Sequence, residues 1–63
     1  MKAQAILKDW MDGRTATWLA KKMGVTLHSA CGWLNGTYTP KLEHRIKLSE
    51  MVGQDLCDPA LWV

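Results

Sequence analysis

A glycine between two short apolar patterns restricts the fold of this chain more than any other feature. Trp18 to Thr26 is typical of a short amphipathic helix followed by a tight turn centred on Gly24, and Trp33 to Gly36 ends a second short helix. Glycine is favoured at such a turn because it adopts left-handed backbone angles without a steric penalty. Two helices joined so closely cannot lie antiparallel. We expect them to cross at a steep angle, which leaves the second helix exposed on the surface.

The rest of the chain also predicts helices. Near the N-terminus, apolar residues follow the i, i+3, i+4, i+7 spacing of one helical face: Ala3, Ile6, Leu7 and Trp10. Asp12-Gly13 is expected to end this first helix, and Thr15 and Thr26 are expected to be the N-caps of the next two. No segment alternates with the period of a strand. The sequence therefore predicts an all-α fold, a compact four- to five-helix bundle.

The positions that should face the core can be read from the same spacing. The second and third helices are expected to bury Leu19, Ala20, Met23, Ala30 and Trp33. A fourth helix, from about Lys41 to Val52 and ended by Gly53, is expected to bury Leu42, Ile46 or the stem of Arg45, Leu48, Ser49 and Val52. In the tail, residues 54–63, we expect at most one turn around Leu56, because Pro59 limits helix length.

A chain of 63 residues predicts a single domain, residues 1–63, at the small end of what folds alone. Such domains often gain stability from disulfides, metals or a partner subunit. The two cysteines, Cys31 and Cys57, follow no export signal or membrane-spanning stretch, so we expect reduced thiols, a cytoplasmic location and no membrane contact. Dimerisation is then the expected source of added stability.

Charge is distributed unevenly along the chain, whose net charge is +2. Residues 14–47 hold six basic side chains and one acidic one, whereas the two ends together are acidic. A basic middle region suits a surface that meets nucleic-acid phosphates. An ordinary solvated surface is the competing interpretation.

Several motifs occur together in one register: Thr15, Leu19-Ala20, Met23-Gly24-Val25-Thr26, Trp33-Leu34-Asn35-Gly36, Pro40, Leu42-Glu43, Leu48 and Gly53. In this register the chain resembles the Cro and phage-repressor type (XRE-like) of helix-turn-helix DNA-binding domain, with the helix-turn-helix at about residues 15–35. The resemblance implies a lambda-repressor-like fold and a transcriptional regulator, in most cases a repressor from a phage or mobile element. It also implies a homodimer on a pseudo-palindromic double-stranded DNA operator in a bacterial or phage-infected cell.

The resemblance assigns base-reading positions to the third helix: Leu27, His28 and Gly32, with Ser29 beside them. His28 can donate or accept a hydrogen bond at a base edge, and Leu27 can contact a thymine methyl group. Gly32 offers no side chain, although it permits close approach of the backbone. We therefore expect modest direct readout, supplemented by DNA shape and by neighbours such as Ser29 and Tyr38.

Phosphate contacts are expected on both sides of that helix. The N-terminus of the second helix points backbone donors and a positive dipole end toward a phosphate. The residues predicted to contact phosphates are Thr15, Thr17, Lys21, Asn35, Thr37, Tyr38 and Lys41. Contacts of this kind set register and affinity without reading sequence.

Other features leave alternatives open. The apolar tail should either fold back on its own core or anchor a partner subunit, and we expect a dimer interface at Leu61 and Trp62. Trp18 should pack on the first helix or lie at an interface. His28, Cys31, His44 and Cys57 have no recognised zinc-finger spacing, so no metal is expected; neither is a cofactor, a small-molecule ligand or an enzyme activity. The alternative function is a helix-turn-helix protein-interaction module, an anti-repressor or adaptor that does not itself bind DNA.

Overall fold

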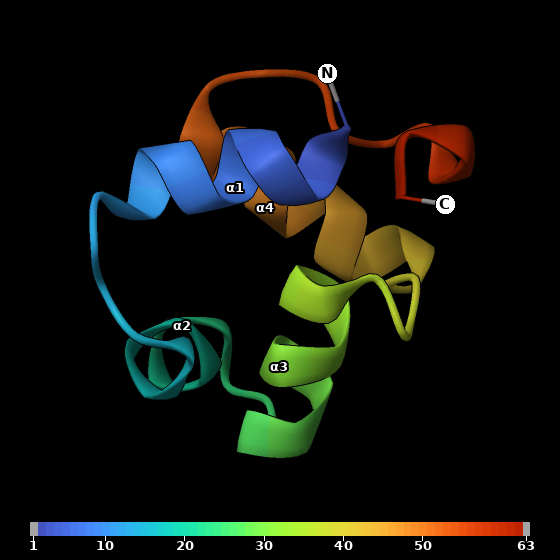
Figure 1. Ribbon diagram of the computed structural model, residues 1–63. Helices are drawn as coiled ribbons and strands as arrows, with labels where there is room; N and C mark the ends of the chain where they lie inside the picture. Colours follow the sequence, from blue (N-terminus) through green and yellow to red (C-terminus); the bar gives the residue numbers. More distant parts are fainter. Residues whose placement is uncertain (1, 63) are drawn as a thin grey trace.

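The computed structural model describes residues 2–62, and in that range it contains helices and no strand. Four α-helices are followed by a short 3-10 helix (Figure 1): α1 Ala3–Met11, α2 Ala16–Met23, α3 Leu27–Asn35, α4 Leu42–Val52 and η1 Pro59–Trp62. The described residues measure 24 × 20 × 18 Å along their principal axes. The predicted all-α bundle is confirmed. The outermost residues of the predicted single domain, Met1 and Val63, lie outside the described range.

The helices begin and end where local signals in the sequence predict. Thr15 and Thr26 are the N-caps of α2 and α3, and each hydroxyl oxygen accepts a backbone N–H at 3.2 Å, from Trp18 and Ser29 respectively. Each of these bonds satisfies a donor that the first turn of a helix would otherwise leave unpaired. Gly24, after α2, has a φ of 71°, the left-handed conformation expected of it.

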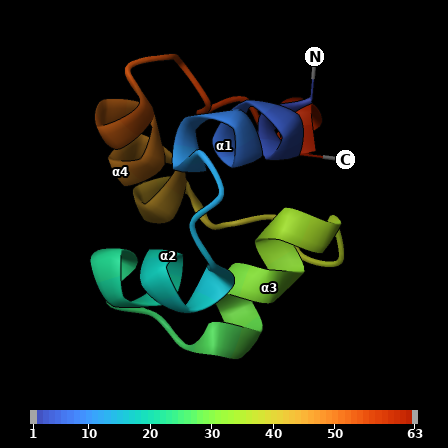
Figure 2. The same ribbon diagram turned by 60° about the vertical axis from the view of Figure 1, so that its left-hand side comes forward.

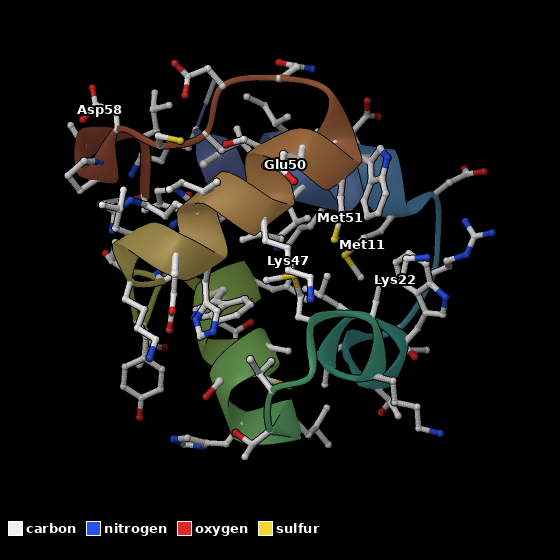
Figure 3. All side chains as sticks on the ribbon, turned by 180° about the vertical axis from the view of Figure 1, so that it is seen from behind. Met11, Lys22, Lys47, Glu50, Met51 and Asp58 are labelled. Atoms are coloured by element: carbon white, nitrogen blue, oxygen red, sulfur yellow. The ribbon has the colours of Figure 1, made fainter. Side chains whose placement is uncertain are left out.

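The core lies between two helix pairs. α1 and α4 form one side of the molecule, and α2 and α3 form the other (Figures 1 and 2). Met11 of α1 and Met51 of α4 both point into the space between α1, α4 and α2 (Figure 3). The buried apolar residues are Ala3, Leu7, Met11, Leu19, Ala20, Met23, Ala30, Trp33, Leu48, Leu56 and Trp62. All five core residues predicted for α2 and α3 are among them.

The inward face of α4 differs from the prediction. Leu42, expected in the core, is 56% exposed. Of the two alternatives at the next position, Ile46 is 43% exposed and Arg45 is half-buried. Leu48 is buried, and Met51 and Val52 pack against the core beside it. These three lie on a different side of the helix from Leu42 and Ile46, because successive helical residues are rotated by about 100°.

Arg45 helps to fix which side of α4 faces the core. Its Nε donates to the Cys57 carbonyl at 2.8 Å, and its Nη1 donates to the Pro40 carbonyl at 2.7 Å. The half-buried guanidinium therefore joins the chain before α4 to the tail after it. Arg45 was counted among the basic residues of the predicted phosphate-binding region, but in the structure its charge is directed at backbone carbonyls.

The tail folds back onto its own chain, which is one of the two outcomes left open by the sequence. Trp62 is fully buried, and its Nε1 donates to the Leu56 carbonyl at 2.9 Å. Because Trp62 has no exposed surface, its predicted place in a dimer interface is corrected: it anchors η1 beside α1. Leu61 is only partly buried. The tail contains one helical turn, as expected, but this turn begins at Pro59 and does not surround Leu56.

Candidate nucleic-acid interface

The α2–α3 pair has the shape that the short turn predicts. The helices are joined by residues 24–26, and Figure 1 views α2 nearly end-on while α3 runs down the page, so their axes are steeply inclined. Ala30 and Trp33 attach α3 to the core and are buried. The opposite side of α3 is left on the outside of the molecule.

The outer side of α3 presents Leu27, which is 50% exposed, together with exposed His28 and Asn35 and half-buried Cys31. The loop after α3 lies against this side and encloses a shallow hollow of about 110 Å³ with it. The hollow is lined by His28, Cys31, Gly32, Asn35, Thr37 and Tyr38. We call these six residues together with Leu27 the outer α3 face.

Gly32 lies at the bottom of the outer α3 face, covered by the loop that follows the helix. The backbone N–H groups of Thr37 and Tyr38 donate to the Gly32 carbonyl at 2.9 and 3.2 Å, which turns the loop back along the helix. The Tyr38 ring then covers Gly32 so closely that a Cβ at position 32 would lie 2.0 Å from the ring atom Cδ2. The expectation that the Gly32 backbone approaches DNA is therefore corrected, because Tyr38 fills that space.

Tyr38 is joined to His28 as well. The Tyr38 hydroxyl and His28 Nε2 are 2.7 Å apart, and the two ring centroids are 5.3 Å apart with planes inclined by 57°. Tyr38 is predicted both to contact phosphate and to supplement base readout, and the structure places its ring on the same face as His28. Its side chain remains 45% exposed.

Ser29, the fourth predicted base reader, is engaged locally. Its backbone N–H donates to Thr26 Oγ1, and the Thr26 hydroxyl donates to Ser29 Oγ at 3.1 Å. The side chain is half-buried in this N-cap. Ser29 therefore orients the start of α3 and is less available to a base than His28.

The predicted phosphate-contacting residues are exposed, but they are not equally free to act. Thr17, Lys21, Asn35 and Thr37 lie on the surface. The oxygen of Thr15 already accepts the Trp18 N–H, so this hydroxyl has its proton left to offer.

Lys41 is paired within its own chain. Its Nζ lies 2.7 Å from Glu43 Oε1, and this hydrogen bond and the lysine charge, followed by the charge of His44, lower the pKa of Glu43. Glu43 therefore competes with any phosphate for Lys41. Both side chains are more than two-thirds exposed, so solvent screens the pair.

A cluster of cations and tryptophans beside α2 was not predicted. Trp18 packs on Trp10 of α1 with ring centroids 5.6 Å apart, which confirms the expected contact with the first helix. The Arg14 guanidinium lies 4.9 Å from the centre of the Trp18 ring, and Lys22 Nζ lies 6.0 Å from it. Arg14 and Lys22 belong to the basic region identified in the sequence, but only the structure shows that both lie over the same ring, that of Trp18.

Of the four residues considered for zinc, His28 and Cys31 share the outer α3 face, whereas His44 and Cys57 lie elsewhere. His44 packs on the Trp33 ring with centroids 5.2 Å apart, and Cys57 lies beside the Ser49 hydroxyl, whereas His28 pairs with Tyr38. Within residues 2–62, no three His, Cys, Asp or Glu side chains gather as metal ligands would. In the same range, no helix has the length and apolar character needed to cross a membrane.

Comparison with known proteins gives no match among protein-family models, curated proteins or solved structures. The function therefore has to be argued from the geometry and chemistry of the outer α3 face.

Proposed function

We propose that this protein binds double-stranded DNA in a sequence-dependent way and regulates transcription, as an operator-binding repressor. One observation carries the proposal: α3 is fixed across α2 by a three-residue turn, with its inner side in the core and its outer face exposed. A helix held in this way fits the major groove of B-DNA, which is wide enough to admit it. The polar groups of His28 and Tyr38 are then directed at base edges, and Asn35, the last residue of α3, lies where a phosphate contact is expected.

Basic side chains in and before α2 support the same function. Exposed Lys21 lies in the last turn of α2, whereas Lys22 and Arg14 lie over the Trp18 ring, which packs on α1. Phosphate neutralisation by such residues supplies essentially all of non-specific DNA affinity and much of specific affinity. The capped N-terminus of α2 adds backbone donors and a positive dipole end, as expected of a phosphate contact.

A homodimer remains part of the proposal, because two copies of α3 one helical turn apart, about 34 Å, would read a pseudo-palindromic site. Fully buried Trp62 is unavailable for the interface. Among the described residues, Leu42 and Ile46 are the exposed large apolar side chains outside the outer α3 face, so they are the first positions to vary. Sedimentation equilibrium of the wild type and of Ile46→Lys, over a range of concentrations, measures whether a dimer forms and whether α4 contributes to it.

The direct test is fluorescence anisotropy of a labelled random duplex pool, titrated with protein at several salt concentrations. We expect micromolar or tighter binding at low salt, and a log affinity that falls linearly with log salt concentration. Lys21→Glu should weaken binding by about tenfold or more and reduce the slope by about one unit. Lys8→Glu is the matched control, since it makes the same charge change on α1, on the other side of the molecule (Figure 1).

A protein-interaction module is the second candidate, and exposed Leu27 favours it. An apolar side chain that is 50% exposed at the start of α3 could anchor another protein as well as contact a thymine methyl group. In that case no duplex would bind even at low salt, and Lys21→Glu would have almost no effect on binding to the protein partner.

The two charge variants also test DNA binding itself. Equal losses of DNA affinity for Lys21→Glu and Lys8→Glu would show that DNA is attracted to the net charge of the protein and not to a defined contact surface.

A further inference from the structure

We propose that His28 and Tyr38 read DNA as one unit, in which the Tyr38 side chain takes the place of the side chain missing at position 32. This inference rests on the proposed function, because it assigns a base preference to the same outer α3 face. It goes beyond that function by naming the two residues that act together and the base pair they favour.

The first step is steric. Position 32 lies one helical turn after His28, so a side chain there would stand beside the histidine on the outer face. In this chain the Tyr38 ring fills that space, and a Cβ at position 32 would meet ring atoms Cδ2 and Cε2 at 2.0 and 2.7 Å. Glycine at position 32 therefore lets a residue from the following loop supply the chemistry of the helix face.

The second step concerns the placement of the tyrosine. The loop is held by the two N–H groups that donate to the Gly32 carbonyl, and the hydroxyl is held by His28 Nε2 at 2.7 Å. The ring is thus fixed at its base by the backbone and at its tip by a side chain, and nearly half of its surface remains exposed. A side chain held at both ends loses less conformational entropy when it meets DNA.

The third step is hydrogen-bond chemistry. A neutral imidazole has one donor and one acceptor nitrogen, and one proton lies between His28 Nε2 and the Tyr38 oxygen. If Tyr38 gives that proton, its oxygen accepts from outside and His28 Nδ1 donates. If His28 gives it, the two roles exchange. In both arrangements the pair presents one donor and one acceptor to a partner.

This combination fits adenine better than guanine. In the major groove adenine offers an acceptor at N7 and a donor at its N6 amino group, whereas guanine offers two acceptors, N7 and O6. Guanine has no donor on its own edge, so one member of the unit would have to reach across to the N4 amino group of the paired cytosine, whereas adenine satisfies both members on a single base. We therefore infer that the unit favours an A·T pair at the position it contacts.

The test is selection of preferred duplexes from a random pool by the wild type, Tyr38→Phe, His28→Ala and the double variant. Phenylalanine keeps the ring over Gly32 and removes the hydroxyl. We expect the wild type to prefer an A·T pair at one position of its site, and each single variant to weaken that preference roughly 5- to 150-fold at the same position. The double variant should lose no more than the stronger single variant, because the two residues act as one unit.

Lys21→Gln is the control, since loss of a phosphate contact should weaken binding to all sequences about equally. Thermal unfolding of each variant verifies that it is folded. If the wild type selects a site and the variants keep its preferences, the paired readout is wrong while the DNA-binding function stands. Changes at different positions, additive losses or a preference for G·C at the affected position would equally overturn the pair. If the wild type binds no duplex, the proposed function and this inference both fail.

Discussion

Two aromatic side chains, Trp62 in the tail and Tyr38 in the loop after α3, fold back onto their own chain with opposite consequences. Trp62 is fully buried, and its one polar atom donates to the Leu56 carbonyl. Tyr38 is 45% exposed, and its hydroxyl pairs with a side chain, His28, on an exposed helix face. Trp62 therefore completes the core, whereas Tyr38 shapes the surface.

The difference lies in what each polar group has left to offer. The indole N–H is a donor only, and once it donates to a backbone carbonyl it has no hydrogen-bonding capacity left for another molecule. The tyrosine hydroxyl and the imidazole each keep a free donor or acceptor after pairing. The contrast shows that the partner of a polar atom, as well as its burial, separates a side chain that holds the fold from one that can bind.

The largest expected effect is on stability. Trp62→Ala should lower the free energy of unfolding by about 3–5 kcal/mol, because it leaves a cavity and removes the anchor of η1. That is a large share of the stability of so small a domain. Tyr38→Ala, at an exposed position, should cost less than about 1 kcal/mol. Urea denaturation measures both, and Trp62→Phe, which keeps an aromatic ring, supplies a folded form for comparison.

If Trp62→Ala and Tyr38→Ala cost similar amounts, the division between a structural tail and a surface loop is wrong. The slope of unfolding free energy against urea concentration independently reports how much surface each variant exposes when it unfolds. A slope that stays constant across the variants shows that the same fold is being compared.

A smaller effect is expected from two serines, Ser49 of α4, which is bonded to the tail, and Ser29 at the start of α3. Ser49 Oγ accepts the Leu56 N–H at 2.8 Å and donates to the Arg45 carbonyl at 2.7 Å. Ser49→Ala should cost about 1–3 kcal/mol, because the partly buried Leu56 N–H loses its partner. Ser29→Ala should cost less than about 1 kcal/mol, since its hydroxyl only accepts an exposed bond from Thr26. Equal urea midpoints for the two variants would contradict this ranking.

The smallest stability effect is expected at Gly32, although this variant should change the surface most. Gly32→Ala gains about 1 kcal/mol of helix propensity, but the new methyl group must displace the Tyr38 ring and break its contact with His28. We expect a net change within about 1 kcal/mol. Nuclear Overhauser contacts between the Tyr38 and His28 rings should disappear. Their persistence in Gly32→Ala would show that the ring is not held where we describe it.

Much of the fold could be predicted because its signals are local. A threonine before a helix accepts a backbone N–H three residues later, and a glycine after it adopts a left-handed conformation; both depend on a few neighbouring residues. Thr15, Thr26 and Gly24 carry these signals, and the helix ends follow them. The inward positions of α2 and α3 follow from apolar spacing.

The face of α4 could not be predicted in the same way. This helix has one apolar pair at Leu42 and Ile46 and another set at Leu48, Met51 and Val52, on different sides. Spacing alone does not choose between them. Arg45 contributes to the choice, because its guanidinium donates to backbone carbonyls before and after the helix, and these contacts between distant residues cannot be read from the sequence.

The outer α3 face could be predicted only in part. Exposed Leu27 and His28 follow from the helix spacing once Ala30 and Trp33 face inward. The position of Tyr38 over Gly32 depends on how the loop after α3 bonds back to the helix. The burial of Trp62 likewise depends on a contact between the two ends of the chain, since η1 packs beside α1.

The most direct test of the account is a map of amide chemical-shift changes when ¹⁵N-labelled protein is titrated with a DNA duplex at low salt. Binding through the outer α3 face predicts the largest changes at residues 27–41 and at the N-terminus of α2. The tail, residues 54–62, should stay nearly unchanged. Changes centred on the tail or on α1, or no changes at all, would contradict the claim that α3 is the DNA-binding element.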